Sequence, residues 1–184
     1  LRWGNKYGNT SLIDGLVKDG LTDVYDGKAM GVAGELCARE CGITRDEQDA
    51  FAIESYKRSQ SAWEKGLFAN EVVPVEIPQR KGDPLVFAKD EEPYNVKFDK
   101  IASLAPAFDK NGTVTAANAS GINDGAAAVV LMEAGAAQAR GAKPLARLVG
   151  YAHTGVDPKL MGIGPVSASR LALQRAGLTV NDMD

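Results

Sequence analysis

Residues 112–128 read GTVTAANASGINDGAAA, and this stretch decides the fold more than any other in the chain. Small residues packed this densely let a ligand or another backbone approach closely. The side chains of Asn118, Ser120 and Asn123 could hydrogen-bond a neutral polar ligand such as an amide chain. A tight turn between packed layers would have the same composition, so composition alone favours the two interpretations equally.

Strand and helix signals alternate after this stretch. The apolar runs at residues 128–132 and 144–151 are typical of strands buried on both faces of a sheet. Helices are predicted over residues 133–140 and 167–176, each followed by glycine. This alternation predicts an α/β fold. Two core strands are too few for a buried sheet, so we expect the chain, which begins at Leu1 rather than Met, to be a piece of a longer protein.

Two helices are predicted before the stretch. Apolar residues recur at helical spacing from Met30 to Cys41, and Thr44 with Glu47 forms a capping box for a helix over residues 45–65. The second helix has an apolar stripe, which we expect to be buried. Its members are Phe51, Ala52, Tyr56, Ala62 and Trp63.

An extended segment and a long polar excursion separate these helices from the small-residue stretch. Residues 71–77 contain Pro74, which confines them to an edge or isolated strand. Residues 78–111 are charged and irregular, which is typical of a lid or binding loop.

Composition excludes several classes of partner and chemistry. The 184 residues carry a net charge of −3, which provides no basic field for nucleic acid or for an anionic membrane. No apolar run approaches the ~20 residues of a membrane span. His153 is the only histidine and Cys37 and Cys41 the only cysteines, too few for a structural zinc site. We expect a structural His153 and two reduced, half-buried thiols, hence a cytoplasmic protein without a bound metal.

Residues 162–165 (GIGP) resemble the start of a dinucleotide-binding loop. The third glycine is missing, and Pro165 is typical of an ordinary helix start, which we favour.

The stretch at residues 112–128 resembles the signature of thiolases, the acetyl-CoA acetyltransferase family. Further blocks resemble the same family in its order and spacing, across nearly the whole chain. These blocks are residues 19–23 (DGLTD), 30–31 (MG), 45–52 (RDEQDAFA), 71–75 (EVVPV), 155–158 (GVDP) and 161–170 (MGIGPVSASR).

The resemblance implies an incomplete thiolase-like α/β fold. Residues 1–122 would form the loop or lid domain over the coenzyme A site. Residues 123–143 would end the N-terminal half of the fold, and residues 144–184 would begin its C-terminal half. Family members assemble through the loop domain, so the resemblance implies a homotetramer.

The resemblance also implies the reaction. Thiolases condense two acetyl-CoA to acetoacetyl-CoA and CoA, or run the reverse thiolysis, through a cysteine acyl-enzyme. The family's catalytic residues match no position here, so this chain is expected to be inactive alone. Coenzyme A thioester would be the substrate, with no separate cofactor. The alternatives are a longer-chain 3-ketoacyl-CoA thiolase and a non-catalytic module for CoA binding or assembly.

Eight positions match the family's surface for coenzyme A and its pantetheine arm. Phe108, Met30 and Met161 would form an apolar wall, and Ser120 would bond a pantetheine amide. Met161 resembles the short-chain type, because a bulky side chain there shortens the acyl pocket. Ala29 and Pro93 depart from the family pattern at two polar coenzyme contacts. The eight positions are Leu21, Met30, Phe108, Ala116, Ala119, Ser120, Ile122 and Met161.

Overall fold

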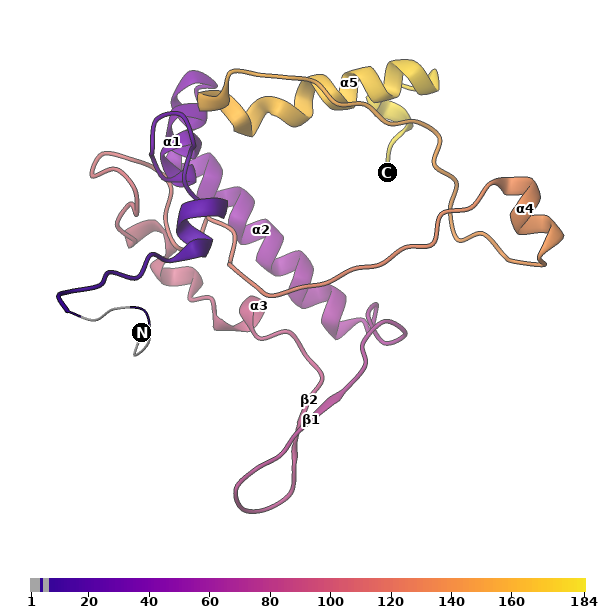
Figure 1. Ribbon diagram of the computed structural model, residues 1–184, viewed down its shortest axis with the longest axis horizontal. Helices are drawn as coiled ribbons and strands as arrows, with labels where there is room; N and C mark the ends of the chain where they lie inside the picture. The colour runs from indigo at the N-terminus through magenta and orange to yellow at the C-terminus, as the bar shows by residue number, and fades with distance from the viewer. Residues whose placement is uncertain (1–3, 5–6) are drawn as a thin grey trace. The chain divides into compact units, whose positions relative to one another are not determined.

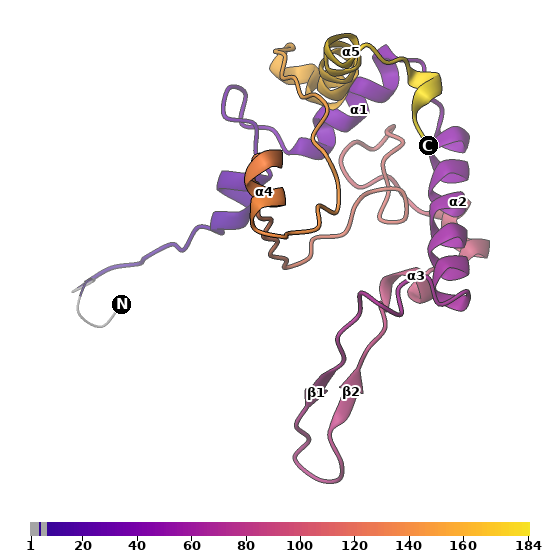
Figure 2. The same cartoon turned by 90° about the vertical axis from the view of Figure 1, so that its right-hand side faces the viewer.

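The structure, a computed structural model, describes residue 4 and residues 7–184 and divides into two compact units. The second unit comprises residues 38–120, and the first unit comprises the chain on either side of it. Figures 1 and 2 show the elements of each unit from two directions. In chain order they are η1 (Leu16–Gly20), α1 (Met30–Glu40), α2 (Arg45–Glu64), β1 (Val75–Ile77), β2 (Leu85–Phe87), α3 (Glu92–Asn95), η2 (Phe98–Ser103), α4 (Ala134–Ala139), η3 (Pro158–Ile163), α5 (Gly164–Ala176) and η4 (Val180–Asp182).

Helix α2 is the longest described element of the second unit, and it begins where the capping box predicts. The Thr44 hydroxyl accepts from the Glu47 N–H at 3.2 Å, while the Glu47 carboxylate accepts from the Thr44 N–H at 2.8 Å. These bonds satisfy N–H groups that the first helical turn leaves unpaired. Gly66, which follows the helix, has a φ of 67°, a left-handed conformation that favours glycine.

One face of α2 is covered by η2 and α3. Tyr56 meets Phe98 of η2 edge-on, with 6.3 Å between the ring centroids, and Gln60 donates to the carbonyl of Pro93 at 2.6 Å. Ala52 is buried on this face. Phe51, predicted to be buried, is instead 79% exposed. The prediction was wrong because a helix turns about 100° per residue, which carries Phe51 away from the covered face.

The predicted extended segment before residue 78 ends in a hairpin. Strand β1 pairs antiparallel with β2, with Val75 opposite Phe87 and Ile77 opposite Leu85. Pro74 precedes the first paired residue, as the missing N–H of proline requires. Figure 2 shows the hairpin projecting away from α2 within the second unit.

The first unit contains the predicted helices α4 and α5. The Glu133 side chain accepts from the Ala136 N–H at 2.9 Å and so caps α4. Helix α5 ends at Gly177, which has a φ of 70°. It begins at Gly164 with Pro165 in its first turn, which confirms an ordinary helix start there.

The two predicted core strands do not form in the described part of the chain. Residues 128–132 and 144–151 are without regular secondary structure. Val129, Val130 and Leu131 are 81%, 88% and 79% exposed. A strand exists only through hydrogen bonds to neighbouring strands, and the described residues place none beside these runs. The two apolar runs are therefore present without the inter-strand hydrogen bonds of the sheet that they predict.

Candidate functional site

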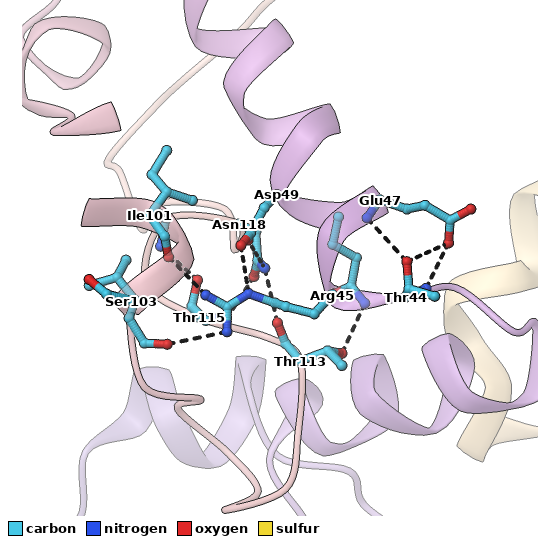
Figure 3. A network of polar contacts seen from close by, with 12 residues as sticks. Thr44, Arg45, Glu47, Asp49, Ile101, Ser103, Thr113, Thr115 and Asn118 are labelled. Atoms are coloured by element: carbon cyan, nitrogen blue, oxygen red, sulfur yellow. Dashed lines mark hydrogen bonds and ion pairs between the residues drawn. The ribbon is translucent and has the colours of Figure 1, made fainter. Parts of the chain in front are cut away.

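The strongest polar cluster lies between α2 and the small-residue stretch, entirely within the second unit (Figure 3). Arg45 and Asp49 are four residues apart, which places both side chains on one face of α2. The Arg45 Nε donates to Asp49 Oδ2 at 2.7 Å. Its Nη1 and Nη2 donate to the carbonyls of Leu104 and Ile101, at 3.2 and 2.8 Å. Arg45 thus holds residues 101–104 against the start of the helix.

Asn118 continues this chain of hydrogen bonds from the other side. Its Nδ2 donates to Asp49 Oδ1 and to the Thr113 carbonyl, both at 2.9 Å. Its Oδ1 accepts from the N–H of Thr115 at 2.6 Å, and Thr115 is fully buried. The Gln48 Nε2 adds a bond to the Thr113 hydroxyl at 2.9 Å. We call Arg45, Asp49 and Asn118 the polar latch.

The latch leaves a row of small side chains facing outward. Thr115 is buried and Asn118 is half-buried, whereas Ala116, Ala119 and Ser120 are exposed. The loop therefore has a hydrogen-bonded inner side and a free outer side, on which a chain-like ligand could lie close to the backbone.

Four of the eight predicted coenzyme positions belong to this unit. Phe108 is 43% exposed, and the bond from the Ala107 N–H to the Val114 carbonyl at 2.9 Å ties its segment to the small-residue loop. The structure thus gathers Phe108, Ala116, Ala119 and Ser120 on neighbouring segments.

The other four positions belong to the first unit. Leu21 and Met30 are neighbours, because the Met30 N–H donates to the Leu21 carbonyl at 2.9 Å. Met161 lies in η3 and is 48% exposed. Ile122 lies in a segment without regular secondary structure and is 68% exposed. That all eight positions form one coenzyme surface stays a prediction.

The sequence interpretation missed the role of Asn118. Its amide was expected to be available to a ligand, but both of its polar atoms bond the protein instead. The signal that could have revealed this is Asp49, a carboxylate on the covered face of α2 with an arginine one turn before it. A buried carboxylate requires partners, and an amide from a distant loop supplies one.

The shifted pKa values belong to structural groups. Hydrogen bonds from backbone N–H groups hold the pKa of Glu47, Glu133 and Asp182 below its ordinary value. All three carboxylates are exposed caps of helix starts. Burial, together with the nearby Glu92 carboxylate, raises the pKa of Tyr56.

The remaining candidate groups are not assembled into a reactive centre. Cys37 is half-buried and Cys41 is exposed, and both are free thiols. Cys41 was expected to be half-buried, but it follows the last residue of α1, at an uncovered helix end. His153 is exposed. Across residue 4 and residues 7–184, no group of three or more His, Cys, Asp or Glu side chains could hold a metal ion. No helix in the same residues is long and apolar enough to cross a membrane.

One groove of the first unit is lined by none of the eight positions. It has a volume of about 460 Å³ and lies between residues 147–150 and α5, lined mainly by small and apolar side chains.

Comparison with known proteins gives the family. The model described as the thiolase N-terminal domain matches residues 1–135, and the model described as the thiolase C-terminal domain matches residues 142–184. The acetyl-CoA acetyltransferases of Chromobacterium violaceum and Cupriavidus necator are 54% and 52% identical to the whole chain. The chain spans 47% of the length of each.

Solved structures agree with these relatives. The crystal structure of the Bacillus anthracis acetyl-CoA acetyltransferase matches with a TM-score of 0.86 and 42% identity, over all of this chain and 46% of that one. The structure of the acetyl-CoA acetyltransferase from Syntrophomonas wolfei matches with a TM-score of 0.84 and 40% identity, over the same shares. These matches confirm the predicted thiolase-like α/β fold, of which this chain covers part. The chain belongs to the thiolase family.

Proposed function

We propose that the protein containing this chain is an acetyl-CoA C-acetyltransferase, which condenses two acetyl-CoA to acetoacetyl-CoA and CoA or runs the reverse thiolysis. The relatives' names support this activity. The observation that carries the role of this chain is the loop at residues 113–120, whose inner side is fixed on α2 and whose outer side is small residues and one hydroxyl. Such a surface suits the narrow, amide-containing pantetheine arm of coenzyme A.

The contribution of this chain is binding rather than bond-making. The Ser120 hydroxyl would exchange a hydrogen bond with a pantetheine amide, while Ala116 and Ala119 let the arm lie against the backbone. Met161 would limit the length of the acyl group by its bulk. The cysteine that takes the acyl group, and its acid–base partners, would be supplied by residues outside these 184.

The exposed apolar runs support a role within a longer protein. Val129, Val130 and Leu131 are each more than three-quarters exposed. Runs of this kind are stable only when other strands cover them. The relatives have about twice the length of this chain. We further propose a cytoplasmic homotetramer, for which the two free thiols support the reducing compartment.

Thiolysis by the whole protein tests the proposed activity. With CoA present, we expect acetoacetyl-CoA to be consumed, measured as loss of the enolate absorbance, and a ketoacyl-CoA of eight carbons to react far more slowly. Equal or faster reaction of the eight-carbon substrate would instead identify a longer-chain thiolase. CoA binding without any thiolysis would identify a non-catalytic module. The 184 residues expressed alone should show no thiolysis.

A further inference from the structure

The polar latch uses nearly all of its hydrogen-bonding capacity inside the protein. Asp49 accepts from Arg45 on one oxygen and from Asn118 on the other. Asn118 donates twice and accepts once. Asp49 is 6% exposed, so its charge is held by these partners rather than by water. The latch is therefore a single arrangement with few alternatives of similar energy.

This arrangement fixes the turn at residues 116–119 from both ends. Before the turn, the Thr115 N–H is bonded to the side chain of Asn118, three residues later. Within it, the Ala117 N–H donates to the Thr115 hydroxyl at 3.3 Å. Asn118 itself is tied to Asp49 of α2. Figure 3 shows Thr115 and Asn118 within the hydrogen-bonded cluster. Ala116 and Ala119, on the same turn, are exposed.

The amide at residue 118 is specific to this role. It must accept from a backbone N–H and donate to a carboxylate at once, which only an amide side chain of this length does. An aspartate would keep the acceptor but bring a second carboxylate to the 2.9 Å position beside Asp49. Like charges this close in a buried site repel strongly.

We propose that Arg45, Asp49 and Asn118 are positioning residues for the coenzyme A thioester. Asn118 sets the position of Ser120 and its two neighbouring alanines, and Arg45 sets the segment that precedes Phe108. This inference rests on the proposed function, because it assigns the outer side of the loop to the pantetheine arm. The latch touches no substrate and acts only through the loop that it holds.

A double-mutant cycle on the whole protein separates positioning from folding. The variants are Asn118→Asp, Ser120→Ala and both together, with thiolysis of acetoacetyl-CoA as the assay. We expect Asn118→Asp to raise KM about tenfold while kcat falls much less, since a tenfold weaker affinity corresponds to about one lost hydrogen bond. If Asn118 acts through Ser120, then Ser120→Ala should cost much less in the Asn118→Asp background than in the wild type.

Two further variants keep the test decisive. Asp49→Asn combined with Asn118→Asp again places one amide donor opposite one carboxylate, and it should reverse part of the rise in KM. Arg45→Lys replaces a guanidinium that donates to three acceptors by a single ammonium, and it should also raise KM. This variant keeps the inference testable if Asn118→Asp does not fold. Glu54→Gln, on the exposed side of the same helix, is the matched control and should change nothing.

A lowered melting temperature with unchanged KM in Asn118→Asp and Arg45→Lys would overturn the inference. The inference would also be overturned if Ser120→Ala raised KM by the same factor in the wild type and in the Asn118→Asp variant, because the two residues would then act independently. Failure of the proposed function would look different, because the wild type itself would not thiolyse acetoacetyl-CoA. In that case, calorimetry of the same variants would measure the Kd for CoA. The same non-additivity between Asn118→Asp and Ser120→Ala is expected in Kd. Additive effects on Kd would contradict a positioning role of the polar latch.

Discussion

The side-chain amide of Asn118 donates a hydrogen bond to the carboxylate of Asp49 at 2.9 Å, across 69 positions of sequence. This bond joins the second turn of α2, the longest helix among the described residues, to the loop of small residues. It explains how a loop without bulky side chains keeps one conformation. The polar latch supplies the order that an apolar core would otherwise provide.

The first prediction compares two ion pairs on α2. Arg45–Asp49 and Arg58–Glu54 have the same four-residue spacing and the same 2.7 Å separation, but Asp49 is 9% exposed by its side chain and Glu54 is 55% exposed. Asp49→Ala removes the partner of two half-buried groups and should lower the free energy of unfolding by about 3 kcal/mol. Glu54→Ala should lower it by about 0.5 kcal/mol or less.

Urea unfolding of the whole protein measures both values. Equal losses for Asp49→Ala and Glu54→Ala would show that the latch adds no more than an ordinary surface pair.

The second prediction concerns the pH dependence of the α2 cap. Hydrogen bonds from the N–H and the hydroxyl of Thr44 lower the pKa of Glu47 from its ordinary 4.5. A lowered folded-state pKa means that the stabilisation is present above pH 4.5 and is lost as pH falls through the lower value. The carboxyl carbon resonance of Glu47 should therefore titrate with a midpoint below 4.5.

Glu47→Gln is the control for this titration. It retains an acceptor for the Thr44 N–H and removes the charge, so the start of α2 should lose its pH dependence. A Glu47 midpoint at or above 4.5 would contradict the capping box as the cause.

The third prediction concerns the contact between η3 and α1 within the first unit. A Cβ added at Gly162 would lie 3.1 Å from the Cys37 Sγ, closer than most Cβ contacts in folded proteins, so the sulfur would have to shift. Gly162→Ala should therefore lower the free energy of unfolding by about 1 kcal/mol. Cys37→Ala in the same protein should restore most of this loss, because the sulfur is the nearest obstacle.

Gly155→Ala is the matched control, since a Cβ there meets nothing within 4 Å. Thermal unfolding of the three variants measures the effect. A loss in Gly162→Ala that Cys37→Ala does not reduce would place the obstacle elsewhere.

The fourth prediction concerns acyl-chain length. If Met161 limits the acyl pocket, Met161→Ala should raise kcat/KM for a six-carbon ketoacyl-CoA relative to acetoacetyl-CoA by about tenfold. Met161→Leu, which keeps the volume, should leave the ratio nearly unchanged. An unchanged ratio in Met161→Ala would remove Met161 from the acyl pocket.

Local signals predicted the helices well. The capping box at Thr44 and the glycines at residues 66 and 177 mark the ends of α2 and α5 because caps depend on neighbouring residues alone. Phe51 was misplaced, since periodicity shows that a face is apolar but not which side a partner covers. The runs at 128–132 and 144–151 have the residues of buried strands, yet a strand needs neighbours that these residues do not supply.

The candidate site was predictable only in part. The stretch at residues 112–128 indicated a surface for close approach, and the structure places Ala116, Ala119 and Ser120 on an exposed side. The latch behind them was not visible in the sequence, because no local pattern relates Asp49 to a residue 69 positions away. Binding of coenzyme A at the eight positions stays a prediction from the resemblance.

Hydrogen exchange of the whole protein, with and without CoA, tests most directly whether the latched loop is the coenzyme surface. We predict that CoA slows exchange in peptides covering residues 107–122 and leaves the hairpin β1–β2 unchanged. Unchanged exchange at residues 107–122 under saturating CoA would show that this loop is not part of the coenzyme surface.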